Sequence, residues 1–329
     1  MLKRKIEKDL IEWKNKKDKT CLMIKGARQV GKTFIVNKFV KENYKFYTYI
    51  NFIENPEYAA IFEGNLNVDN LIKQISIRVE GAQLEPFKTL IFLDEIQMCP
   101  KARTALKFFS LDKRFDVIAS GSLLGINYKG VPSFPVGYVE HLEMYSLDFE
   151  EFLWANNISE NSISDIKEYY NKKEKVPLAI HTRMMELFKE YIIVGGMPRV
   201  VMEYINTKNF SKVLKLQRGI LIDYEDDIAK YADNQEKVRT KACFNSIPKQ
   251  LAKEYKKFQY SVVEKKSTAK KYSNSIKWLK DAGIINICHN ISNIELPLEG
   301  YAKEDCFKIY MADTGLLMAM LDDGAQEDT

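Results

Sequence analysis

One short stretch restricts the fold of this chain more than any other: GARQVGKT, residues 26–33, lies between an apolar run and an amphipathic one. The run at residues 21–24 predicts a buried strand, and the residues after Thr33 predict the start of a helix. Two glycines separated by four residues and followed by Lys-Thr form a loop whose backbone N–H groups approach an anion at a helix N-terminus. The stretch therefore predicts a phosphate-binding loop.

The residues of this loop have separate expected roles. In a loop of this pattern the lysine, here Lys32, reaches the β- and γ-phosphates, and the hydroxyl of Thr33 binds Mg²⁺. We therefore expect ATP and Mg²⁺ as ligands. The residues expected to bind the nucleotide are Gly26, Ala27, Arg28, Gln29, Val30, Gly31, Lys32, Thr33 and Phe34.

A second stretch, LIFLDEIQ at residues 90–97, supplies the acids that a nucleotide site needs. Its four consecutive apolar residues suit a strand buried on both faces of a parallel sheet. At the end of that strand Asp94 is expected to hold Mg²⁺, and Glu95 to orient and polarise an attacking water. The chain is thus predicted to be an ATP hydrolase, with Glu95 and Lys32 as catalytic residues.

The order of the remaining elements predicts the fold class. Further strands are expected at residues 45–52, 89–97, 115–122 and 139–145, and helices at 3–13, 32–41 and 101–111. This alternation predicts an α/β domain at residues 1–146, a P-loop NTPase parallel sheet. A helical lid at 147–235, opened by a capping box between Asp148 and Glu151, is expected to follow. Residues 236–329 predict helices and then a hairpin, the outline of a basic α+β winged-helix domain.

Two serines are expected beside the phosphate. Ligands of open α/β sheets bind outside the carboxyl ends of the strands. Ser120 and Ser122, at the end of the strand at 115–122, are therefore expected to face the γ-phosphate and to sense it. The alternative for Ser122 is that it only begins the following turn.

Composition excludes several other classes of protein. No apolar run approaches the ~18 residues of a membrane span, and the first residues lack the apolar segment of a signal peptide, so we expect a cytoplasmic protein without a membrane partner. The five cysteines never occur in C-x-x-C spacing, which supports neither a disulfide framework nor a zinc site. The three histidines, His141, His181 and His289, are isolated and are expected to be structural.

The net charge of +5 is unevenly distributed. Residues 236–288 contain thirteen Lys or Arg against four acids. Six lysines around the predicted recognition helix would bind the DNA backbone with strong salt dependence and little sequence preference. The alternatives are a solvated helix face and a winged helix used only for packing. The six are Lys265, Lys266, Lys270, Lys271, Lys277 and Lys280, with Asn274 and Ser275 as candidate base contacts.

Several motifs together resemble one family. GARQVGKT, LIFLDEIQ, ASGSLLG, MYSLDFEEFLWA, GGMPRVV and YMADTGLL are similar to motifs of prokaryotic AAA-type ATPases of largely unknown role. The resemblance extends over nearly the whole chain, and it implies a P-loop ATPase with Walker A and Walker B motifs. Members usually carry a C-terminal domain of unknown function that looks like a restriction nuclease. Because the chain stops soon after YMADTGLL, we expect that domain to be missing.

The resemblance implies further site residues. Asn51 stands where AAA-type proteins keep a polar residue that restrains the catalytic glutamate, although an ordinary strand-end turn is an equal alternative. Pro198 resembles the element that packs a lid against adenine, and Arg199 is either a phosphate sensor or a surface arginine. Gly137 and Tyr138 stand where an arginine finger is usual, which implies slow turnover.

The sequence therefore predicts a Mg-ATP-binding, slowly hydrolysing AAA-type molecular switch whose winged helix contacts double-stranded DNA or a protein. The alternative is a nucleic-acid- or protein-binding module in which the bound nucleotide is structural and turnover is negligible. A small-molecule kinase fits poorly because Glu95 after Asp94 favours water as the nucleophile. The sequence sets neither the oligomeric state nor the physiological partner.

Overall fold

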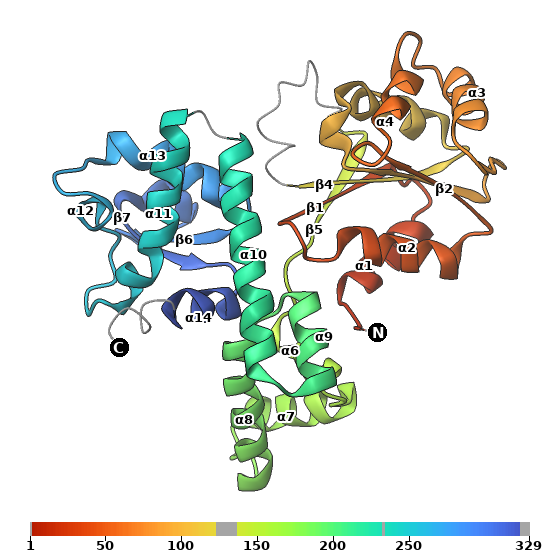
Figure 1. The fold of residues 1–329 in the computed structure, drawn as a ribbon. Helices are drawn as coiled ribbons and strands as arrows, with labels where there is room; N and C mark the ends of the chain where they lie inside the picture. Colours follow the sequence, from red (N-terminus) through yellow and green to blue (C-terminus); the bar gives the residue numbers. More distant parts are fainter. Residues whose placement is uncertain (1, 123–136, 232–233, 323–329) are drawn as a thin grey trace. The chain divides into compact units, whose positions relative to one another are not determined.

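The computed structural model describes residues 2–122, 137–231 and 234–322. These residues form two compact units (Figure 1), which we describe one at a time. One unit is made of residues 4–145, and the other of residues 146–322 together with residues 2 and 3. The chain therefore passes from one unit to the other at two points, between residues 3 and 4 and between residues 145 and 146.

The unit of residues 4–145 is built on a parallel sheet with the strand order β2-β3-β4-β1-β5. The parallel-sheet α/β fold predicted from the sequence is thereby confirmed. The strands are β1 Cys21–Gly26, β2 Phe46–Asn51, β3 Thr89–Asp94, β4 Asp116–Ser122 and β5 Val139–Glu143. The helices are α1 Ile6–Asn15, α2 Lys32–Asn43, α3 Val68–Arg78 and α4 Pro100–Asp112, with 3-10 turns at Pro56–Phe62 and Ile96–Met98.

Helices cover both faces of this sheet because successive side chains of a strand point to opposite faces. Cys21 and Met23 of β1 pack in one core with α3 and α4, and Leu22 and Ile24 pack in another with α1 and α2. Figure 1 shows the two helix pairs on opposite sides of the strands. The central strand β3 is buried at all six positions, as its continuous apolar run predicts.

The N-terminal helix α1 begins three residues later than predicted. Its buried residues, Ile6, Leu10 and Trp13, lie at helical spacing and pack into the core shared with α2. Arg4 lies before the helix, and its side chain contacts other parts of the unit.

The unit of residues 146–322 is mainly helical. Asp148 caps α6 with both hydrogen bonds of the predicted capping box, which confirms that prediction. The predicted domain boundary at residue 236 lies in the first turn of α11. The elements are α6 Phe149–Ala155, α7 Glu160–Lys172, α8 Leu178–Val194, α9 Pro198–Thr207, α10 Phe210–Tyr231, α11 Asn234–Ala252, α12 Tyr260–Val263, α13 Ala269–Asp281, β6 Ile285–Ile291, a 3-10 turn at Leu298–Tyr301, β7 Ala302–Met311 and α14 Thr314–Asp322.

Strands β6 and β7 form the expected antiparallel hairpin. The helix that follows, α14, was not expected from the sequence. It begins at a buried carboxylate: Asp313 accepts hydrogen bonds from the backbone N–H groups of Gly196 (2.8 Å) and Leu316 (3.2 Å). A Cβ on Gly196 would lie 2.0 Å from the carbonyl oxygen of Leu147, so this close approach requires glycine. Packing inside this unit thus accounts for the second glycine of GGMP.

Among the described residues, none of the helices combines the length and the apolarity that a membrane-spanning segment requires.

Candidate nucleotide-binding site

The predicted site residues meet at the carboxyl edge of the parallel sheet. Gly26 at the end of β1 is in register with Ser122 at the end of β4. Asn51 at the end of β2 is in register with Asp94 at the end of β3. Because β4 lies between β1 and β3, its Ser120 lies between the loop and Asp94.

The loop after β1 has the backbone that its glycines predict. A Cβ on Gly26 would lie 2.2 Å from the carbonyl oxygen of Met144, so no side chain fits there. Gly31 precedes the first turn of α2 with φ 95°, a value that other residues rarely adopt. Gln29 is also left-handed, with φ 63°. These turns bring the loop to the N-terminus of α2, where backbone N–H groups favour an anion.

Lys32 folds back onto this loop. Its Nζ donates to the carbonyl oxygens of Gly26 (3.0 Å) and Ala27 (2.8 Å), and only 8% of the residue is exposed. Burial lowers the pKa of Lys32 to about 8, although the nearby carboxylates of Glu95 and Asp94 act in the opposite direction. The ammonium group of Lys32 is thus hydrogen-bonded to carbonyl oxygens of its own loop. A bound phosphate would have to replace these carbonyls as the acceptor.

Asp94 is the centre of the hydrogen bonds in this site. Its Oδ2 accepts from the hydroxyls of Thr33 (2.7 Å) and Tyr49 (3.0 Å). Its Oδ1 accepts from the hydroxyl of Ser120 and from the backbone N–H of Glu95 (3.0 Å). Since Asp94 is 1% exposed, these donors supply hydrogen bonds to a carboxylate that has almost no contact with water.

The contact of Thr33 with Asp94 fits a magnesium site. Mg²⁺ prefers oxygen ligands and usually keeps several waters beside one or two protein groups and substrate phosphates. A hydroxyl and a carboxylate oxygen 2.7 Å apart are donors of this kind. The described residues contain no cluster of three or more His, Cys, Asp or Glu side chains suited to a metal. Phosphate and water oxygens would therefore have to complete the coordination.

Glu95 has a left-handed backbone, with φ 54° and ψ 42°. Its Oε2 accepts a hydrogen bond from the Nε2 of Gln97, a residue that is 5% exposed. Gln97 had no expected role. The contact could have been predicted from the sequence, because Gln97 follows Glu95 by only two residues. A short turn at Ile96–Met98 brings the two side chains together.

Asn51 makes the contacts of a strand-end turn. Its Oδ1 accepts from the backbone N–H groups of Ile53 (2.9 Å) and Glu54 (3.2 Å), and its Nδ2 donates to the hydroxyl of Tyr49 (3.0 Å). In this structure Gln97 donates to the carboxylate of Glu95, whereas Asn51 is linked to Asp94 through the hydroxyl of Tyr49. The restraint of Glu95 by Asn51 stays a prediction.

Tyr49 is a second site residue without an expected role. It lies two positions before Asn51 on β2, so strand periodicity places both on the same face of the sheet. Burial and the neighbouring Asp94 carboxylate raise the pKa of Tyr49, which keeps its hydroxyl protonated as a donor.

The other predicted nucleotide-binding residues lie in different places. Phe34, in the first turn of α2, is 54% exposed. Ser122 is buried at the end of β4. Pro198 and Arg199 belong to the other unit, where Pro198 opens α9 and Arg199 is exposed.

The basic region lies around α13, in the unit of residues 146–322. Five of its six lysines are exposed, whereas Lys271 is half-buried and its Nζ lies 2.6 Å from Glu264. Ser275 is fully buried and donates to the Oε2 of Glu236 (3.0 Å). Ser275 is therefore turned away from the solvent, and Asn274 is the remaining exposed candidate for a base contact.

Comparison with known proteins matches two parts of the chain to family models. Residues 18–153 match a family described as AAA domain. Residues 185–327 match a family described as domain of unknown function (DUF8612), a description that does not identify a nuclease-like domain. The comparison with curated proteins found no match.

Solved structures give a matching fold. A Walker-type ATPase of Pyrococcus abyssi is 13% identical with a TM-score of 0.55, over 98% of this chain and 96% of that chain. The RuvB branch migration motor of Thermotoga maritima (14%, TM-score 0.37, 87% and 89% covered) and AMPPCP-bound DnaA of Aquifex aeolicus (15%, TM-score 0.34, 84% and 86% covered) are less similar. TM-scores as low as these last two do not establish a common fold.

The parallel sheet, the phosphate-binding loop and the match to an AAA domain together support a P-loop AAA-type ATPase. This assignment applies to the unit of residues 4–145. The residues that match the AAA domain and the residues of the described site lie almost entirely within that unit.

Proposed function

We propose that the protein is a Mg-ATP-dependent molecular switch of the AAA type that hydrolyses ATP slowly and contacts double-stranded DNA through a winged helix. The observation that carries the proposal is the set of hydrogen bonds around Asp94. Thr33 of α2, Tyr49 of β2 and Ser120 of β4 all donate to this carboxylate. Because these donors come from three different elements, a ligand that binds at Asp94 would change hydrogen bonds in all three of them.

The residues of the loop would bind the triphosphate. Lys32 would leave the carbonyls of Gly26 and Ala27 and bind the β- and γ-phosphates, with backbone N–H groups at the start of α2 as further donors. Thr33 and Asp94 would hold Mg²⁺, which when bound neutralises charge on the phosphates. Ser120 and Ser122 would sense the γ-phosphate from the end of β4.

Glu95 would act on water. Its carboxylate would orient a water for attack on the γ-phosphorus and accept a proton from it as the bond to the ADP oxygen breaks. In this structure the carboxylate is instead hydrogen-bonded to Gln97. The bond supports slow turnover, because it holds one oxygen of the carboxylate at Gln97 and leaves only the remaining acceptor sites for a water.

The DNA contact is proposed from the order of elements after residue 234. Three helices, α11, α12 and α13, precede the hairpin of β6 and β7, and this order of elements supports a winged helix. Exposed lysines of α13, including Lys270, Lys277 and Lys280, would bind phosphates of the DNA backbone.

A second function is supported by the same bond between Gln97 and Glu95. If the bond to Gln97 keeps the Glu95 carboxylate away from the attacking water, bound ATP would be structural, and the protein would be a nucleic-acid- or protein-binding module with negligible turnover.

The substitution Glu95→Gln tests the hydrolytic role. We expect ATP to bind as in the wild type and turnover to fall by about 100-fold or more, since general base catalysis contributes this much. Hydrolysis is measured with and without duplex DNA, and binding by calorimetry. Glu12→Gln, which changes an exposed acid of α1, is the matched control. Unchanged hydrolysis by Glu95→Gln would reject the role of Glu95, and ATP binding without wild-type hydrolysis would favour the second function.

A further inference from the structure

The side chain of Arg4 is hydrogen-bonded to the backbone of the phosphate-binding loop. The residue is 7% exposed, and its Nη1 donates to the carbonyl oxygen of Val30 at 3.1 Å. Val30 is itself 2% exposed, so the bond lies inside the unit of residues 4–145. Arg4 stands 26 residues before Val30, and no sequence motif indicates the contact.

The bond to Val30 determines the direction of a donor in the loop. The carbonyl of Val30 and the N–H of Gly31 belong to one planar peptide group, and in a trans peptide they point in opposite directions. A carbonyl fixed toward Arg4 therefore directs the Gly31 N–H away from Arg4. Gly31 needs such fixing more than other residues, because its left-handed backbone at φ 95° has the conformational freedom of glycine.

The same guanidinium binds the end of this unit. Nη2 of Arg4 donates to the carbonyl oxygen of Tyr145 at 2.7 Å. Tyr145 is the residue after which the chain leaves the unit, and Arg4 is the residue with which it enters. One side chain therefore joins the phosphate loop to both connections with the other unit.

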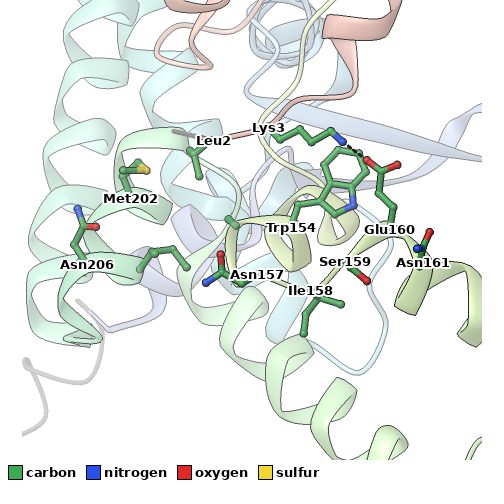
Figure 2. A pocket seen from close by; sticks show the side chains of 12 residues that line it. Leu2, Lys3, Trp154, Asn157, Ile158, Ser159, Glu160, Asn161, Met202 and Asn206 are labelled. Carbon is green, nitrogen blue, oxygen red and sulfur yellow. Dashed lines mark hydrogen bonds and ion pairs between the residues drawn. The ribbon is translucent and has the colours of Figure 1, made fainter.

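The residue before Arg4 is held in the other unit. Lys3 forms an ion pair with Glu160, and its Nζ lies 5.1 Å from the centre of the Trp154 ring. Figure 2 shows these three side chains at the edge of a hollow of about 730 Å³, with Leu2 beside them. The peptide bond between Lys3 and Arg4 thus links side chains anchored in different units.

We propose that Arg4 is a positioning residue for the nucleotide: it directs the Gly31 N–H toward the phosphates and connects the state of the loop to the chain at Tyr145. The proposal rests on the proposed ATP binding. Arginine suits the role because its planar fork reaches two carbonyl oxygens at once, whereas a lysine ammonium on a flexible stem is not organised in this way.

Two substitutions test the proposal. Arg4→Met keeps much of the apolar stem and removes the hydrogen bonds to Val30 and Tyr145, and we expect it to weaken ATP binding roughly tenfold, since hydrogen bonds from charged groups contribute this much. Arg4→Lys should recover part of the affinity. Arg78→Met, at an exposed arginine of α3, should leave it unchanged. ATP affinity is measured by calorimetry, and because Arg4 is proposed to act on phosphate binding, KM should rise more than kcat falls.

Hydrogen exchange separates positioning from stability. In the wild type, saturating ATP should protect peptides that cover residues 26–33 and residues 143–148. In Arg4→Met at saturating ATP, the protection of 143–148 should be lost. If Arg4→Met does not fold, Arg4→Lys and the exchange of the wild type still test the proposal.

Failure of the role of Arg4 can be distinguished from failure of ATP binding itself. If the wild type does not bind ATP, the proposed function is wrong and the role of Arg4 is wrong with it. If ATP binding is lost in Lys32→Ala but is unchanged in Arg4→Met, only the role of Arg4 is wrong. That role is also rejected if ATP protects residues 143–148 equally in the wild type and in Arg4→Met.

Discussion

Lys32 shows how one residue can couple ATP binding to a change of protonation. Its ammonium lies on two carbonyl oxygens of its own loop and is almost fully buried. Burial disfavours the charged form, whereas a bound triphosphate would favour it. We therefore expect the pKa of Lys32 to be higher in the ATP complex than in the free protein.

This coupling predicts the pH dependence of ATP affinity. The pKa of Lys32 without nucleotide is about 8, so below pH 8 the lysine is already protonated and affinity depends little on its titration. Above about pH 8 binding must include uptake of a proton, and affinity should fall roughly tenfold per pH unit until the pKa of the complex is reached. Calorimetry in two buffers of different ionisation enthalpy, at about pH 7 and about pH 9, measures the proton uptake directly. A constant affinity between these values would contradict the coupling.

Other residues of the site differ in how far the sequence predicts them. Lys32, Thr33 and Asp94 lie in motifs whose spacing implies their chemistry, and the structure brings them to one edge of the sheet. Gln97 was within reach of the same reasoning, since it follows Glu95 in a short turn. Arg4 was not, because its contact with Val30 depends on how the chain before α1 packs.

At the scale of elements, the buried carboxylate of Asp313 decides where α14 begins. Burial raises the pKa of Asp313, while the N–H groups of Gly196 and Leu316 lower it by donating hydrogen bonds. The carboxylate thereby joins the loop before α9 to the helix after the hairpin.

The substitution Asp313→Asn tests this connection. An amide keeps one acceptor oxygen but turns an NH₂ group toward a backbone N–H, so a buried donor loses its partner. We expect the free energy of unfolding to fall by about 1–3 kcal/mol. Urea denaturation measures the change, and Asp165→Asn on the exposed face of α7 is the control. Equal stability of the two variants would show that the bonds to Asp313 contribute nothing.

The sequence predicts elements best where one pattern is enough. The buried run of β3 and the capping box of α6 are both local signals, and both are confirmed. The start of α14 was missed because only part of its signal is local: the bond from the N–H of Leu316 to Asp313 spans three residues, whereas the bond from Gly196 comes from far away in the chain. The GGMP stretch was interpreted through a family resemblance, whereas close backbone packing at Leu147 accounts for its second glycine.

At the scale of the whole molecule, the uneven distribution of charge leads to a prediction about salt. If the exposed lysines of α13 bind DNA phosphates, the logarithm of the affinity should fall linearly with the logarithm of salt concentration. Replacing Lys270, Lys277 and Lys280 by Gln should reduce this slope by about 3. Fluorescence anisotropy with labelled duplexes of two unrelated sequences measures it.

The control for this prediction changes the same charge elsewhere. Lys8, Lys17 and Lys73 are exposed in the unit of residues 4–145, and their replacement by Gln should leave the slope unchanged. If both triple variants lose affinity equally, net charge rather than α13 is responsible. If neither binds DNA less well than the wild type, the basic surface is not a DNA site.

The two places where the chain passes between the units set an order for folding during synthesis. A ribosome releases the N-terminus first, and domains generally fold as they emerge. Residues 4–145 have most of their partners available once Tyr145 has been made. Lys3 contacts Trp154 and Glu160, and both of these residues are synthesised after Tyr145. Lys3 is thus synthesised before Arg4, but it can reach its final contacts only after all residues of the unit that carries the phosphate loop have been made.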